Sequence, residues 1–494
     1  PPPPPPPTTT TKIATTTTNG EQMASPSISR CMRDIAALAV PALGMVLCDP
    51  LMSLVDTACV GQTSLLGLAA LGPNTSVFNF VFQVFTFLAV ATTSLIGRCL
   101  AAAKEADSED EAKRRRSEAS AVLSNALLLA GLCGVSACLL LEASAPALLG
   151  ALGVNETLMP HALAYLRIRA LACPAVMVMN VCQGACLGLQ DAVTPMCIIA
   201  LAGVINLVGD VYLILYAGWG VAGAALATAV AQYIGAGLFL RALRGRGKDP
   251  RQGARMVPLR YCGVPTMRAL EPFFEVCRAL VVRNVLQMAC YGAVSYNVLV
   301  TLGTTATAAH QVALQCFWFF SYIGDTLSVA AQALLSSRKA ERARTLARTL
   351  VGLATGVGIG IGSLAVATLT LAPRLFTSTQ GVIDALPGVC PACFVALLLC
   401  TIVLPLDGIS IGSGDFGHLP LVGVASASAT TAALWVARSI EGATLSSFWW
   451  ALVVFFAARL AVHAAHFLRR GERSVFGSAA GQDDLASSPR VALA

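Results

Sequence analysis

The chain has 494 residues, of which 56% are hydrophobic and only 12% are charged, and its mean hydropathy is +0.71. Water-soluble domains carry about 25% charged residues, so the composition excludes a soluble globule. The net charge of +7 does not indicate nucleic-acid binding, because the basic residues lie in short clusters between apolar runs. The sequence therefore predicts a membrane protein with no nucleic-acid partner.

The amino-terminal segment, residues 1–33, begins with seven prolines and is rich in threonine. Such a composition cannot bury a core and favours an extended, solvated chain, so we expect residues 1–33 to be disordered. The segment starts without Met, as a fragment or a processed product would. Its scarcity of acidic residues and its many hydroxyl side chains also suit a plastid transit sequence.

Apolar runs long enough to cross about 30 Å of hydrocarbon occur at twelve places. Their Ala- and Gly-rich composition suits closely packed helices better than a β-barrel. We therefore predict an all-α polytopic membrane protein with twelve transmembrane helices. The predicted spans are residues 34–58, 70–99, 119–141, 160–186, 195–217, 219–243, 271–300, 304–335, 347–372, 389–412, 418–438 and 443–468.

The connecting segments carry their positive charges in alternation. Lys and Arg collect after the second, sixth and eighth spans, and almost none follow the odd-numbered spans. Basic loops stay on the cytoplasmic side, so we expect both chain ends there. The basic linker 244–262 separates a six-helix bundle at 34–243 from a second one at 263–468, and residues 469–494 form a cytoplasmic tail.

An internal repeat supports the division into two halves. Gly184–Asp191 and Gly408–Asp415 share the pattern G-x-x-x-G-x-x-D, each at the connection between the fourth and fifth spans of its half. Duplicated halves commonly build a transporter with its binding site between or within the lobes, although Gly-rich loops can also coincide by chance. We expect Asp191 and Asp415 to cap the helices that follow them.

Ionisable side chains inside the apolar runs are candidates for function, because burying them in hydrocarbon is costly. Asp56 lies in the first span and Asp210 in the fifth, where Asn206 precedes it by four residues and so shares its helix face. A carboxylate that loses solvation in a cavity takes up a proton more easily. These three residues are the predicted cation-coupling group, and the alternative is a purely structural Asp bonded to Asn and backbone.

The first and seventh spans carry other residues of interest. Pro41 and Pro50 lie in the first span, and proline inside a helix removes a hydrogen bond and kinks it, so we expect this span to bend. In the seventh span Glu275 and Arg278 stand three residues apart, which favours an ion pair on one helix face.

Several segments together resemble the multidrug and toxic compound extrusion (MATE) family over about residues 34–468. Those in the first half are most similar to the DinF-type branch, and those in the second half resemble plant members that export citrate or phenolic acids. The segments are Leu54–Gly61, Leu68–Asn74, Gln183–Pro195, Trp219–Thr228, Ala308–Gln311, Ala330–Leu335 and Asp407–Phe416.

The resemblance implies two six-helix bundles around a central cavity that opens alternately to either side. In DinF-type members an acidic residue of the first helix couples transport to protons, and its counterpart is Asp56. Pro41 matches the family's bending point. In other branches an acidic residue of the seventh helix carries the cation, which makes Glu275 the alternative cation site. The counterparts of the family's amino-terminal polar cluster are Tyr165, Gln183, Asn206, Asp210 and Thr228.

We therefore predict a monomeric secondary transporter that exports small organic molecules in exchange for protons. Its expected substrates are xenobiotics or organic anions such as citrate or phenolic acids. Sodium-coupled antiport and flipping of lipid-linked saccharides on a related scaffold are the alternatives. The plasma membrane is the favoured location, ahead of the plastid envelope and the vacuolar membrane.

The sequence does not indicate an enzyme. It contains no HExxH, GxSxG or Walker lysine motif and no cluster of histidines. We expect His463 and His466 to lie at the membrane interface. No cofactor and no bound metal are predicted.

Overall fold

The computed structural model describes residues 28–63, 65–152, 154, 156–245, 267–336, 340–376, 380–415, 417–470 and 475. Within these ranges every regular element is a helix. The first half contains α1 (Ile28–Thr63), α2 (Leu65–Phe85), α3 (Phe87–Glu105), α4 (Glu109–Ala151), α5 (Met159–Ala170), α6 (Cys173–Gly188), α7 (Val193–Asp210), the π-helix η1 (Val211–Tyr216) and α8 (Gly220–Gly245). The second contains α9 (Met267–Leu335), α10 (Ala340–Leu371), η4 (Pro373–Leu375), α11 (Gln380–Ala385), η5 (Pro387–Val389), α12 (Cys390–Gly412), α13 (Leu419–Ser439) and α14 (Leu445–Arg470).

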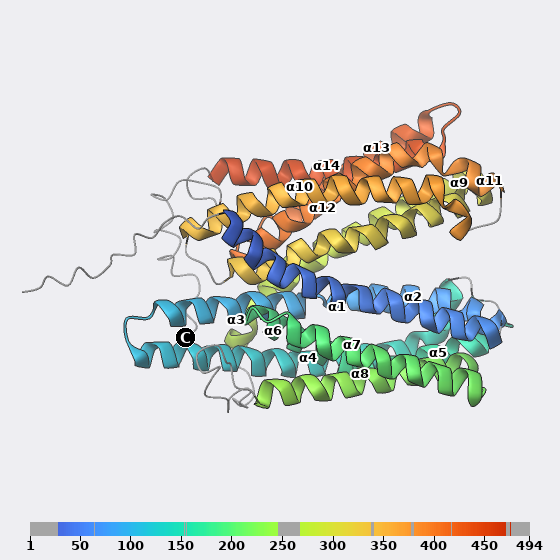
Figure 1. Ribbon diagram of the computed structural model, residues 1–494. Helices are drawn as coiled ribbons and strands as arrows, with labels where there is room; N and C mark the ends of the chain where they lie inside the picture. The colour runs from blue at the N-terminus through green and yellow to red at the C-terminus, as the bar shows by residue number, and fades with distance from the viewer. Residues whose placement is uncertain are drawn as a thin grey trace, which may run out of the picture.

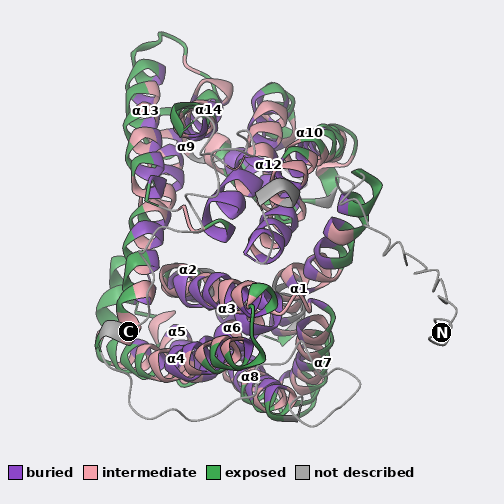
Figure 2. Ribbon diagram, turned by 90° about the vertical axis from the view of Figure 1, so that its left-hand side faces the viewer, coloured by how far each residue is buried: buried purple, intermediate pink, exposed green. Residues whose placement is uncertain are grey.

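The helices are arranged in two bundles that lie side by side (Figures 1 and 2). Helices α1 to α8 make up one bundle and α9 to α14 the other, and α1 runs along the boundary between them. The α3–α4 turn, the end of α8, the start of α10 and the end of α14 share one end of the molecule, on the left of Figure 1. The basic segments flank these helix ends, and we refer to this end as the basic end.

Helix α9 is two antiparallel helices joined at Gly303. The backbone of Gly303 has φ 81° and ψ −169°, a conformation that essentially only glycine adopts without strain. Beyond it the chain folds back, since the rings of Tyr291 and Trp318 lie 5.9 Å apart and Ser295 Oγ lies 2.9 Å from His310 Nε2. In one straight helix the two rings would be about 40 Å apart, at a rise of 1.5 Å per residue.

The helices confirm an all-α polytopic membrane protein. Among the described residues, ten helical spans are long and apolar enough to cross a membrane, or eleven if the bent pair α5 and α6 forms one span. The returning half of α9, residues 304–335, is not in that set, but it is helical at the place of the predicted eighth span. The described residues thus contain helix at all twelve predicted places.

One predicted boundary differs from the helix ends. Helix α1 begins at Ile28, so the last six residues of the predicted tail 1–33 are helical. The earlier part of that tail lies outside the described residues. Most of the linker 244–262 and of the tail 469–494 also lies outside them.

The hydrophobic cores join the two bundles at the basic end. Away from that end each bundle has its own core, one around Phe78 and Leu166 and the other around Phe317 and Phe455. Near the basic end the cores span both bundles: one joins α3, α4 and α6 to the start of α9, and another joins the start of α1 to the end of α9 and to α10. Burial of apolar surface therefore holds the bundles together at the basic end.

The repeated glycines lie inside helices rather than in connecting loops, which corrects their expected place. A Cβ on Gly184 of α6 would collide with the Ala89 carbonyl oxygen of α3, and one on Gly408 of α12 with the Ser328 carbonyl oxygen of α9. Small residues four apart let helix backbones approach closely in membranes. The repeat therefore marks the same helix contact in each bundle.

The aspartates that end the two repeats have different partners. Asp191 Oδ1 accepts a hydrogen bond of 3.0 Å from the Thr194 backbone N–H, so it caps α7 as expected. Asp415 instead pairs with His466 and Arg470 of α14. The expectation of a helix cap at Asp415 was wrong, because the sequence does not show that α14 returns beside this loop.

We expect Gly184→Ala and Gly408→Ala each to destabilise the protein by about 1–3 kcal/mol, the usual cost of overpacking. Thermal unfolding in detergent measures this. Gly237→Ala on α8 is the matched control, because nothing lies within 4 Å of the Cβ it would add. Equal melting temperatures for all three variants would show that the glycines are not packing constraints.

Candidate functional site

Two carboxyl groups from different helices meet at one amide in the amino-terminal bundle. Asn206 Nδ2 donates to Asp210 Oδ2 at 2.7 Å, one helix turn further along α7. The same nitrogen donates to Asp56 Oδ1 of α1 at 3.2 Å. The structure thus brings together the three residues predicted from sequence for cation coupling.

This carboxyl pair is buried. Asp56 is 7% exposed, and Asn206 and Asp210 are 0% exposed. Asn206 Oδ1 and Asp210 Oδ1 have no hydrogen-bond partner within the described residues. Neither carboxyl group forms an ion pair with a Lys, Arg or His of the described chain. Buried acceptors without donors are costly, so the pair is poised to accept a proton or a polar group of a ligand.

The backbone changes its helical form at Asp210. Helix α7 ends there and continues as the π-helix η1. Short π-helical segments occur frequently at functional sites. The π-helix η1 therefore places a local irregularity beside the carboxyl pair.

A cationic and aromatic group lies beside the carboxyl pair. The guanidinium of Arg169 stands 5.2 Å from the Phe78 ring centroid, and its Nη1 donates to Gln232 Oε1 at 2.8 Å. Arg169 and both carboxyl groups act electrostatically on the buried hydroxyl of Tyr165. Tyr165 therefore lies near the predicted site.

The remaining predicted residues are not drawn into this group. Thr228 Oγ1 donates to Ala224 O of its own helix at 2.9 Å, and no hydrogen bond in the described ranges links Thr228 or the half-buried Gln183 to the carboxyl pair. Pro41 lies inside α1, which stays helical through it and through Pro50.

Glu275 and Arg278 are exposed and form no ion pair with each other in the described parts of the chain. The expected pairing is therefore not found.

The carboxy-terminal bundle contains a second buried carboxylate, Asp407 of α12. Its Oδ2 binds Nη2 of Arg459 and lies 3.1 Å from Nη1 of Arg283, and its Oδ1 lies 3.0 Å from His463 Nε2. Arg459 also donates from Nη1 to Gln287 Oε1 at 3.0 Å. Asp407 is therefore held by two guanidinium groups and an imidazole, partners that the carboxyl pair lacks.

Sequence reasoning missed this network. His463 is 0% exposed and so lies inside the bundle, and Arg283 pairs with Asp407. The available signal was Arg459 and His463 four residues apart in the last apolar span, which places them on one helix face.

Comparisons with known proteins agree on one family. The MatE family model matches residues 41–212. "Protein DETOXIFICATION 47, chloroplastic" of Arabidopsis thaliana is 30% identical over 458 residues, which cover 91% of this chain and 80% of that protein. DNA damage-inducible protein F of Escherichia coli K12 is 28% identical over 299 residues, 60% of this chain and 61% of that protein. The crystal structure of the Vibrio cholerae MATE transporter VcmN in the bent form has a TM-score of 0.78 at 19% identity, and the match covers 89% of this chain and 97% of that one.

We expect Asp407→Asn to destabilise the protein by about 3–5 kcal/mol, because it leaves buried guanidinium groups without their anion. Asp210→Asn is the matched control: it is also a buried isosteric change, but no cation loses a partner. Thermal unfolding of both variants in detergent compares them. A smaller loss of stability for Asp407→Asn than for Asp210→Asn would contradict the structural role of the network.

Proposed function

Because the chain belongs to the MATE family of transporters, we propose that it is a secondary antiporter that exports small organic molecules in exchange for protons. It is an integral multi-pass membrane protein and not an enzyme. The observation that carries the proposal is the buried carboxyl pair of Asp56 and Asp210 on the Asn206 amide.

Protonation changes what this pair can bind. Two adjoining carboxylates in a buried place repel each other, and a proton on one of them turns an acceptor into a donor. The unpartnered Asp210 Oδ1 and Asn206 Oδ1 are the acceptors available to that donor. Since Asp56 lies on α1 and the other two residues lie on α7, proton uptake alters the hydrogen bonds between two helices. A ligand that binds two conformations differently shifts their populations.

The arrangement of the cores supports alternating access. The bundles share apolar cores near the basic end and have separate cores away from it. If the basic end is cytoplasmic, this conformation is closed toward the cytoplasm. The prolines Pro41 and Pro50 each remove one backbone hydrogen bond from α1, which provides places where that helix can bend between states.

One proton per cycle supplies enough driving force. A charge that crosses 100 mV gains about 2.3 kcal/mol, and one pH unit adds about 1.4 kcal/mol. At about 1.4 kcal/mol per tenfold ratio, their sum sustains a gradient of several hundredfold for a neutral substrate.

The residues beside the pair favour organic anions as the first substrates to test, such as citrate or phenolic acids. Arg169 supplies a guanidinium for a carboxylate, and Phe78 and Tyr165 supply aromatic surface. The Arabidopsis relatives include proteins named as chloroplastic, which favours the plastid envelope over the plasma membrane. A fluorescent fusion of the chain tests the location.

The test measures substrate accumulation in inside-out vesicles under an imposed pH gradient. For the unmodified chain we expect accumulation to rise about tenfold per pH unit at one proton per neutral substrate. Asp56→Asn and Asp210→Asn should abolish this response while substrate binding remains measurable. Glu275→Gln should retain it.

Two outcomes would contradict the proposal. One is a normal response of Asp56→Asn and Asp210→Asn to the pH gradient. The other is accumulation that follows an imposed sodium gradient and ignores pH, which would make the protein a sodium antiporter.

A further inference from the structure

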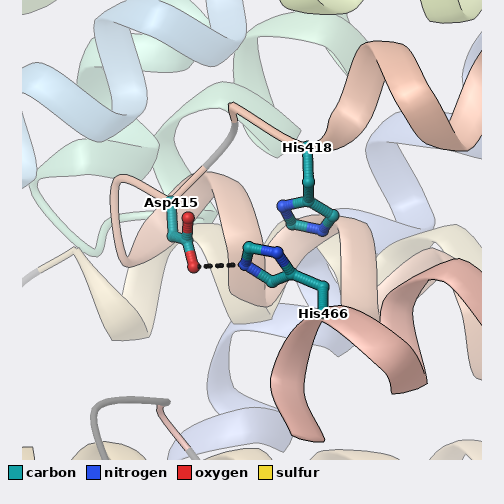
Figure 3. Close-up of side chains that lie close together, drawn as sticks. All are labelled: Asp415, His418 and His466. Carbon is teal, nitrogen blue, oxygen red and sulfur yellow. Dashed lines mark hydrogen bonds and ion pairs between the residues drawn. The ribbon is translucent and has the colours of Figure 1, made fainter. Parts of the chain in front are cut away.

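Three potential metal ligands, from the α12–α13 connection and from α14, converge at the basic end of the carboxy-terminal bundle (Figure 3). Asp415 follows α12, His418 immediately precedes α13, and His466 lies in the last turns of α14. Each offers one ligand atom, and these atoms all lie within 4.8 Å of one another. The rings of His418 and His466 stack with centroids 3.7 Å apart and planes within 10°, so one ring must turn before both in-plane lone pairs can reach one ion.

One nitrogen in this cluster lacks a partner. His418 is 8% exposed, and its Nδ1 has no hydrogen-bond partner among the described residues. Figure 3 shows this edge of the ring on the side of Asp415. A buried nitrogen without a hydrogen-bond partner calls for an explanation. A bare lone pair that faces a carboxylate is unfavourable unless a cation or a hydrogen-bond donor lies between them.

A chain of hydrogen bonds links the His418 ring to Asp407. With a neutral His463, donation from its Nε2 to Asp407 Oδ1 at 3.0 Å leaves His463 Nδ1 as the acceptor for His418 Nε2 at 3.1 Å. His418 then carries its hydrogen on Nε2 and presents a bare lone pair at Nδ1. Metal-bound histidines are commonly oriented in this way by a partner on the other ring nitrogen.

We propose that Asp415, His418 and His466 bind a divalent transition-metal ion of the Zn²⁺ class. Two imidazole nitrogens and one carboxylate are a typical ligand set for Zn²⁺ and do not suit Mg²⁺ or Ca²⁺, which prefer oxygen ligands. Three protein ligands leave one tetrahedral position for water. The ion would fasten the segment between α12 and α13 to the end of α14.

The metal replaces an existing hydrogen bond. His466 Nε2 now lies 2.8 Å from Asp415 Oδ2, and Arg470 Nη1 lies 2.8 Å from the same oxygen. On metal binding, His466 moves its proton to Nδ1 and Nε2 becomes a ligand. Asp415 has two oxygens, so one can bind the ion while the other keeps Arg470. Arg470 is a competitor for Asp415 rather than a ligand.

The test uses the full chain in nanodiscs, purified without a histidine tag and stripped with EDTA. ZnCl₂ is titrated against a chromophoric chelator, and CoCl₂ is added in a parallel experiment. We expect one Zn²⁺ per chain and the visible absorption of tetrahedral Co²⁺. Asp415→Asn, His418→Ala and His466→Ala should each weaken binding by at least ~tenfold, since even supporting residues change metal affinity that much.

Two variants serve as matched controls. His161→Ala removes a histidine of α5, in the other bundle, and should leave Zn²⁺ affinity unchanged. Arg470→Gln should keep or tighten binding because it frees Asp415. Zn²⁺ bound equally by the unmodified chain and by the triple variant of Asp415, His418 and His466 would overturn the proposal. So would an absence of Zn²⁺ binding and of the Co²⁺ absorption in the unmodified chain, which needs no variant to fold.

Discussion

The structure depends on how a membrane protein accommodates buried carboxylates. A charge inside a low-dielectric interior must be paired, protonated or hydrated, and the two bundles meet this requirement in opposite ways. Asp407 is surrounded by Arg283, Arg459 and His463, so its charge is permanently balanced. Asp56 and Asp210 share one neutral amide. The first arrangement is static, whereas the second depends on whether a proton is present.

The same two-bundle scaffold supports both arrangements. The repeated glycines let α6 pack closely against α3 and α12 against α9, so the same close helix contact occurs in each bundle. Helix α1 differs from these, because it contains two prolines and runs along the boundary between the bundles. The carboxyl pair lies between α1 and α7. A change in its protonation therefore acts directly on α1, a helix whose prolines allow it to bend.

The cluster at the basic end links the static carboxylate to the surface of its bundle. Hydrogen bonds run from Asp407 through His463 to His418, whose Nδ1 has no partner among the described residues and faces Asp415. An ion held there would be oriented by the same residue that balances two buried arginines. Electrostatic balance in the interior and order in the segment between α12 and α13 would then depend on each other.

The sequence by itself determined the helical class, the places of the spans, the two halves and the grouping of Asn206 with Asp210. These features follow from local rules, namely hydrophobic length, loop charge and helical periodicity. Only the tertiary structure decided that Asp56 reaches Asn206, that Asp407 lies among arginines, and that His418, His463 and His466 meet. Those contacts join residues 45 to 150 positions apart, and no local pattern specifies which helix face meets which neighbour.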